Sequence, residues 1–172
     1  MKIHIKITEM LLAQARADLR RGHQFALERV GFLTAGASRS SENDIMLVCR
    51  TYHPVADEDY EESTAVGAQI GSDAIRKAIE VAHANKSALL HLHTHGGSGV
   101  PAFSKTDLVS AAQFVPGFFN ALPRSPHGVI VLSNTSAKGL VWTAQDAKPQ
   151  YVDGFVQVGT SVRKFGDRHE QA

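Results

Sequence analysis

Three histidines alternate with other residues in the stretch HLHTH (91–95), directly after an apolar run. In a β-strand, residues two apart point to the same face of a sheet, so His93 and His95 can direct their rings to one point. Imidazole nitrogens are common zinc ligands, and this spacing therefore predicts two ligands of a zinc ion. The alternative is a pair of ordinary surface or packed histidines, which is the more frequent meaning of such a pair taken alone.

A third ligand is available after a glycine-rich loop, at Asp107 in the motif SKTD (104–107). In the first turn of a helix its carboxylate can face back toward the end of the strand. Two imidazoles and one carboxylate leave a tetrahedral zinc one open position for water, which is the pattern of catalytic sites. SKTD is also a helix-capping box, and both interpretations can hold because a cap fixes the position of Asp107. We expect His91 to support the ligands or to pack in the core, with a shifted ligand register as the alternative.

A zinc hydrolase also needs a general base, and Glu28 in ALERVGFLTAG (26–36) is the candidate. Alternation along a strand places Glu28 on the same face as Val30 and Phe32, where a carboxylate is unexpected unless it has a task. The alternative is a glutamate at the end of a strand that points into water beside Arg29.

The elements that must position these residues follow from hydrophobic periodicity and turn signals. We expect one mixed α/β (α+β) domain over 1–160, with a central mixed sheet flanked by helices, and a frayed polar tail over 161–172. The residues expected to begin helices are Thr8, Ser72 and Ser104. The expected strands are 2–7, 26–37, 44–53, 87–95, 127–134, 139–144 and 151–159.

Composition narrows the function classes. The 172 residues are 43% hydrophobic and 20% charged, as in a folded globular domain. A formal net charge of +1 gives no electrostatic reason to expect nucleic acid or an anionic membrane as partner. The single cysteine, Cys49, excludes an internal disulfide framework and a multi-cysteine zinc site. Because no apolar run resembles a signal peptide or a membrane span, we expect a cytoplasmic protein.

ERVGFLTAG followed some sixty residues later by HTH and SKTD resembles the JAMM (MPN+, or JAB) family of zinc metalloproteases. Members of that family carry a glutamate ahead of a G-[FL]-L segment, then H-x-H, a loop and S-x-x-D. This chain departs from the common pattern at Gly96, where the family usually has proline, and in a loop that is one residue longer.

The resemblance covers roughly residues 20 to 145 and implies that the domain over 1–160 is an MPN/JAB domain with cytidine-deaminase-like topology. It implies that His93, His95 and Asp107 hold Zn²⁺, that Glu28 is the general acid/base, and that Ser104 stabilises the oxyanion of the tetrahedral intermediate. The implied activity is that of a deubiquitinase-like isopeptidase, which cleaves behind the tail of a ubiquitin-like protein to remove it from conjugates or to mature its precursor. Small prokaryotic relatives accompany activating-like and conjugating-like enzymes, including those of bacterial antiviral defense systems.

Other functions remain open. The same site could release a small adduct from the tail of a carrier protein. A non-catalytic MPN-type scaffold, or a metal-binding but inactive sensor, would bind partners without chemistry. The acidic stretch DEDYEE (57–62) is either a solvated loop or an attractor for a basic substrate tail, and the glycine turn at 96–99 is either a lid or a plain flexible loop.

Overall fold

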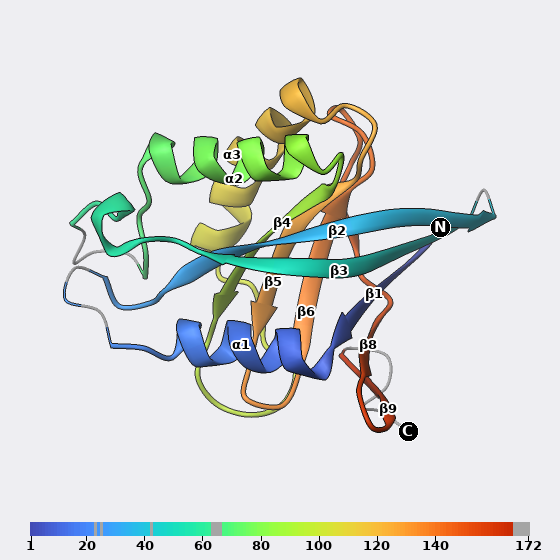
Figure 1. Cartoon of the computed structure of the whole chain (residues 1–172), viewed down its shortest axis with the longest axis horizontal. Helices are drawn as coiled ribbons and strands as arrows, with labels where there is room; N and C mark the ends of the chain where they lie inside the picture. Colours follow the sequence, from blue (N-terminus) through green and yellow to red (C-terminus); the bar gives the residue numbers. More distant parts are fainter. Residues whose placement is uncertain (23, 25, 42, 63–66, 167–172) are drawn as a thin grey trace.

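The computed structural model describes residues 1–22, 24, 26–41, 43–62 and 67–166, which form one mixed sheet with helices on both faces (Figure 1). The helical elements are α1 (Glu9–Leu19), the 3-10 turn η1 (Asp57–Asp59), α2 (Ser72–Ala84) and α3 (Lys105–Ala121). The strands are β1 (Lys2–Thr8), β2 (Val30–Ser41), β3 (Asp44–Pro54), β4 (Ala88–Thr94), β5 (His127–Leu132), β6 (Ala137–Trp142), β7 (Gln150–Tyr151), β8 (Gly154–Val158) and β9 (Val162–Phe165). The expected mixed α/β class is confirmed.

The sheet has the strand order β7-β6-β5-β4-β2-β3-β1-β8-β9. β4 lies inside it, parallel to β5 and antiparallel to β2. In the register of β2 with β4, Val30 is opposite His93 and Phe32 is opposite His91. Side chains of directly opposed residues lie on the same face, so these four residues share one surface.

Two apolar cores lie on the two faces of this sheet. On one face, α1 packs Leu12, Ala15 and Leu19 against strands that include β1 and β3. On the other face, α2 and α3 cover β2, β4 and β5 (Figure 1). The face of β4 that carries His91 and His93 is the one covered by α2 and α3. None of the helices in the described part of the chain is both long and apolar enough to cross a membrane.

Two of the three expected helix starts are confirmed. Thr8 caps α1, where its hydroxyl accepts from the amide of Leu11 at 3.2 Å, and Ser104 caps α3. The expectation that Ser72 caps α2 is wrong, because Gly71 is the cap and Ser72 is the first helical residue. The amide of Gly71 donates to the carbonyl of Asp59 at 2.9 Å, so a contact with a distant segment holds the residue before the helix.

The first part of the segment 161–172, which the sequence predicts to be a frayed tail, belongs to the sheet. Residues Val162–Phe165 form β9, which pairs antiparallel with β8. Phe165 is buried and stacks on Phe155 with a centroid separation of 5.4 Å. The fraying expectation is therefore wrong for these four residues, because one aromatic anchor offsets their polar composition. Residues 167–172 lie outside the described part of the chain.

Candidate metal centre

The histidines are presented by β4 and by the residue that follows it. Alternation along the strand turns His91 and His93 toward α2 and α3, and His93 is only 5% exposed. His95 lies just past the end of β4, where its amide donates to the carbonyl of Leu132 on β5 at 2.9 Å. The rings of His93 and His95 are 4.9 Å apart between centroids, so the two imidazoles converge as the spacing predicts.

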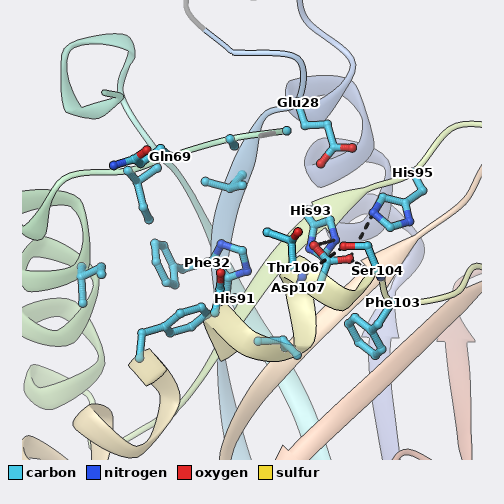
Figure 2. Close-up of a pocket in the computed structure, with 18 residues that line it drawn as sticks. Glu28, Phe32, Gln69, His91, His93, His95, Phe103, Ser104, Thr106 and Asp107 are labelled. Atoms are coloured by element: carbon cyan, nitrogen blue, oxygen red, sulfur yellow. Dashed lines mark hydrogen bonds and ion pairs between the residues drawn. The ribbon is translucent and has the colours of Figure 1, made fainter. Parts of the chain in front are cut away.

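Asp107 faces these rings from the first turn of α3. Its carboxylate accepts from the backbone amide of Ser104 at 2.7 Å, while the Ser104 hydroxyl accepts from the Asp107 amide at 3.1 Å. This capping box fixes the carboxylate with one oxygen 3.5 Å from Nε2 of His93 and the other 3.4 Å from Nε2 of His95 (Figure 2).

The three side chains fit a metal ion. Two ligands bound to one tetrahedral zinc at about 2.0–2.1 Å lie about 3.3–3.4 Å apart, close to the separations between Asp107 and each histidine. Both ring nitrogens of His93 are buried and have no hydrogen-bond partner among the described residues. Buried polar atoms are seldom left unpaired, and a coordinated cation would satisfy one of these nitrogens.

A second carboxylate, that of Glu28, approaches the histidines from the opposite side (Figure 2). One carboxylate oxygen of Glu28 and one nitrogen each of His93 and His95 all lie within 4.8 Å of one another. The described residues thus contain a group that can hold a metal ion, with Glu28 and Asp107 as two carboxylates beside one histidine pair.

Glu28 does not lie on a strand. β2 begins at Val30, so the expectation that the strand starts at residue 26 and places Glu28 by alternation is wrong. Instead, the Glu28 amide donates to the carbonyl of Gly67 at 2.7 Å. A Cβ atom on Gly67 would lie 2.6 Å from the Glu28 carboxylate, so a larger residue here would require the Glu28 side chain to shift.

Arg29 anchors the loop that carries Glu28. Its guanidinium is buried and donates to the carbonyls of Arg21 and Gly22 at 3.1 Å and to the carboxylate of Asp57 at 2.7 Å. These bonds fix the backbone next to Glu28 from two directions. A buried guanidinium with three acceptors is well satisfied.

The pKa values of two groups near the histidine pair, Asp107 and His91, are shifted from their usual values. Partial burial by itself raises the pKa of Asp107, but the interactions with His93 and Ser104 outweigh it and hold the pKa of this carboxyl below its usual value. Asp107 is therefore an anion at neutral pH, as a metal ligand must be. Burial, with a smaller effect of His93, lowers the pKa of His91 to about 3, so this ring is uncharged at neutral pH although it borders a cavity.

The five residues proposed from the sequence border one cavity of about 420 Å³. They are Glu28, His93, His95, Ser104 and Asp107. The sequence patterns do not predict the rest of the cavity wall, which includes Phe32, Ile70, Ile75 and Phe114. The only local signal was the alternation that puts Phe32 on the same face as Val30; the contribution of α2 and of residues 67–70 depends on long-range packing.

The glycine turn is held to the loop between β5 and β6. The Gly97 carbonyl accepts from the Asn134 amide at 3.0 Å, and the Gly99 amide donates to the Thr135 hydroxyl at 2.9 Å. The Gly99 carbonyl accepts from the Ser133 hydroxyl at 2.6 Å. Positive φ angles at Gly97 (87°) and Gly99 (82°) suit glycine and let the chain turn here. These contacts restrain the turn at 96–99, for which the sequence leaves open a lid and a plain flexible loop.

The acidic stretch at 57–62 is partly engaged within the chain. Asp57 pairs with Arg29, and Asp59 pairs with Lys77 at 2.7 Å. Glu61 accepts from the side chain of Gln69 at 2.6 Å. The hypothesis that this stretch attracts a basic tail therefore depends mainly on the exposed Glu58 and Glu62.

The fold and the site define a mixed α/β protein with a histidine–carboxylate cluster able to hold a metal ion. No protein-family model matches the chain, and no curated protein matches it. Among solved structures, it is similar to the N-terminal domain of STIL from Trichoplax adhaerens, with 14% sequence identity and a TM-score of 0.41. That match covers 80% of this chain and 40% of the STIL chain, so this chain spans less than half of the length of that structure.

Proposed function

We propose that this chain is a zinc-dependent peptidase or isopeptidase of the JAMM type, built on an MPN/JAB-like domain. Its substrate is a ubiquitin-like protein, which the enzyme releases from conjugates or from a precursor by cleaving behind the C-terminal tail. The observation that carries the proposal is the convergence of His93, His95 and Asp107, with Glu28 across from them, at one cavity.

The residues divide into ligands and a base by their surroundings. Asp107 is fixed by the capping box within 3.5 Å of both histidines, so it is the better third ligand. Glu28 faces the same histidines from a separate loop, where a carboxylate can accept and return a proton. Bound zinc supplies Lewis-acid chemistry, which makes water a stronger acid and polarises a carbonyl oxygen.

The remaining steps belong to side chains of this protein. Glu28 accepts a proton from the attacking water and then donates it to the nitrogen of the leaving amine. The Ser104 hydroxyl already accepts from the Asp107 amide, and its own O–H can still donate to the oxygen of the substrate carbonyl as negative charge develops there. On this proposal, the partners of the protein are the ubiquitin-like substrate and the activating-like and conjugating-like enzymes that attach this substrate to its targets.

Zinc content separates the proposed roles. Purified wild type, Asp107→Asn and Glu28→Gln are compared by elemental analysis after removal of excess metal. Wild type and Glu28→Gln should retain roughly one zinc per chain, because the three ligands remain, whereas Asp107→Asn should lose most of it.

Turnover is measured on the same proteins with a ubiquitin-like protein fused through its C-terminal tail to a reporter. Glu28→Gln should cleave about 10²–10⁴-fold more slowly than wild type, because its amide cannot transfer the proton. Wild type that binds no zinc would overturn the proposal and favour a scaffold. Zinc loss in Glu28→Gln, with zinc retained in Asp107→Asn, would exchange the roles of the two carboxylates.

A further inference from the structure

The cavity continues past the metal cluster into an apolar chamber between α2 and α3. In Figure 2 the histidine–carboxylate cluster lies at one end with Ser104 and Phe103, whereas Phe32, His91 and Gln69 lie toward the other. The total volume of about 420 Å³ is within the usual range of ligand clefts. A metal ion and one peptide unit would occupy only the polar end.

The floor of this chamber comes from two paired strands. Phe32 of β2 and His91 of β4 are register partners, and their rings meet edge to face at 5.4 Å between centroids. The ring of Phe114 of α3 lies 5.2 Å from that of His91 between centroids and also borders the cavity. Tertiary contacts hold these rings in place, so the chamber is formed before any ligand enters.

Apolar side chains also line the walls of the chamber, beside the polar side chain of Gln69. Ile75 of α2 borders it on one side, and Ala68 and Ile70 border it from the segment that touches Glu28. All three are partly buried and pack against the core that α2 and α3 share. Because this surface and the metal cluster border the same cavity, one ligand can contact both of them.

We infer that the apolar chamber is a specificity pocket for a large apolar side chain, such as leucine, methionine or phenylalanine, on the substrate residue next to the scissile bond. This inference rests on the proposed function, because it assumes that a peptide carbonyl lies at the metal cluster. A tail of glycine alone would leave the walls formed by Phe32, Ile75 and Phe114 in contact with water. A large apolar side chain removes that surface from water, which favours binding.

Two small hydroxamates test the pocket without a known substrate, since the hydroxamate group binds zinc and only the attached group differs. Acetohydroxamate and 3-phenylpropanohydroxamate are titrated into the zinc-loaded 172-residue chain by calorimetry. The phenyl compound should bind about tenfold or more tightly than acetohydroxamate, because its ring enters the chamber. Equal affinities of the two compounds would overturn the inference.

Substitutions that fill the chamber should remove this preference. In Ile75→Trp the phenyl compound should lose about tenfold or more in affinity, while acetohydroxamate should bind as it does to wild type. Ala68→Phe fills the chamber from the opposite wall and replaces Ile75→Trp in the titration if that variant fails to fold. His83→Trp introduces the same side chain at an exposed position of α2, away from the cavity, and should leave both affinities unchanged.

The outcomes separate this inference from the proposed function. If neither compound binds and no zinc is retained, the proposed function fails, and the inference fails with it. If zinc is retained and both compounds bind alike, only the inference fails. A phenyl preference that persists in both filled variants would also overturn it, because the ring would then lie elsewhere.

Discussion

At the scale of single residues, three histidines on one short segment have different surroundings. The ring nitrogens of His93 are buried without a hydrogen-bond partner among the described residues, and its Nε2 lies 3.5 Å from Asp107. His91 is two residues earlier on the same face, and its ring contacts those of Phe32 and Phe114. The same side chain therefore suits a metal ligand at position 93 and an aromatic packing partner at position 91.

A matched pair of substitutions tests this distinction. His93→Phe should lose zinc, because one of the proposed ligands is gone, whereas His91→Phe should retain it. Phenylalanine keeps a flat ring of similar size, so packing is disturbed little in either variant. Elemental analysis gives the zinc content, and circular dichroism checks that both variants are folded.

The reverse result would mean that different residues of this strand are the metal ligands. If His91→Phe lost zinc while His93→Phe kept it, the ligands would be His91 and a neighbour, and Asp107 would lose its assigned role. Loss of zinc in both variants would mean that His91 contributes to the site together with His93.

At the scale of elements, the start of α3 combines a structural and a chemical task. Ser104 caps the helix through its hydroxyl, and the same capping box holds Asp107 against the histidines. The helix start and the metal site therefore depend on each other. This coupling explains why a motif that is common at ordinary helix starts can also serve a site.

Two substitutions at Ser104 separate these tasks. Ser104→Ala should lower the free energy of unfolding by about 1 kcal/mol, and Ser104→Gly by only a few tenths, because glycine is tolerated at the cap position. Both variants lack the hydroxyl proposed to stabilise the oxyanion, so both should lose about 10²–10³-fold in kcat. Urea unfolding and turnover of the reporter fusion measure the two effects. A kcat that follows stability, with Ser104→Gly close to wild type, would leave Ser104 with the capping task alone.

At the scale of the whole molecule, one buried histidine joins β4, β5 and α3. His127, at the start of β5, accepts from the Leu89 amide through Nδ1 at 3.0 Å, and its Nε2 contacts the carbonyl of Leu122 at 3.0 Å, where it donates. The ring also packs edge to face on Phe119 at 4.6 Å. Burial lowers the pKa of His127, although the hydrogen bond that Nε2 donates to the Leu122 carbonyl opposes this shift.

This lowered pKa makes global stability sensitive to acid. Above the ordinary histidine pKa of 6.5, His127 is neutral in both the folded and the unfolded chain, so its contribution is fully present. Below pH 6.5 the unfolded chain binds a proton that the folded chain does not, and stability falls by up to about 1.4 kcal/mol per pH unit from this group. Urea unfolding in chelator from pH 7.5 to 4.5 measures the effect.

His127→Gln is the control for this prediction. It should be less stable at pH 7.5 by about 1–3 kcal/mol, because buried groups lose their partners. Its stability should then depend less on pH than that of wild type, since the titrating ring is absent. Parallel pH curves for the two proteins would assign the acid sensitivity to other groups, among them His91 and His53, whose pKa values burial also lowers.

The amino-acid sequence by itself determined the parts of this protein that follow from short-range geometry. Strand alternation brings the rings of His93 and His95 together, and the capping box at Ser104 orients Asp107, as expected from spacing alone. Such features depend on backbone periodicity over a few residues, and this periodicity can be read directly from the order of the residues. The mixed α/β class follows from the same patterns.

Only the tertiary structure decided how Glu28 reaches the histidines and what surrounds them. Glu28 lies before β2 and is held by the carbonyl of Gly67, a contact between segments far apart in the chain. The apolar chamber likewise needs side chains from β2, α2 and α3 at once. Periodicity reports which face a residue takes within its own element, but it does not report which other element covers that face, because packing between distant segments makes that choice.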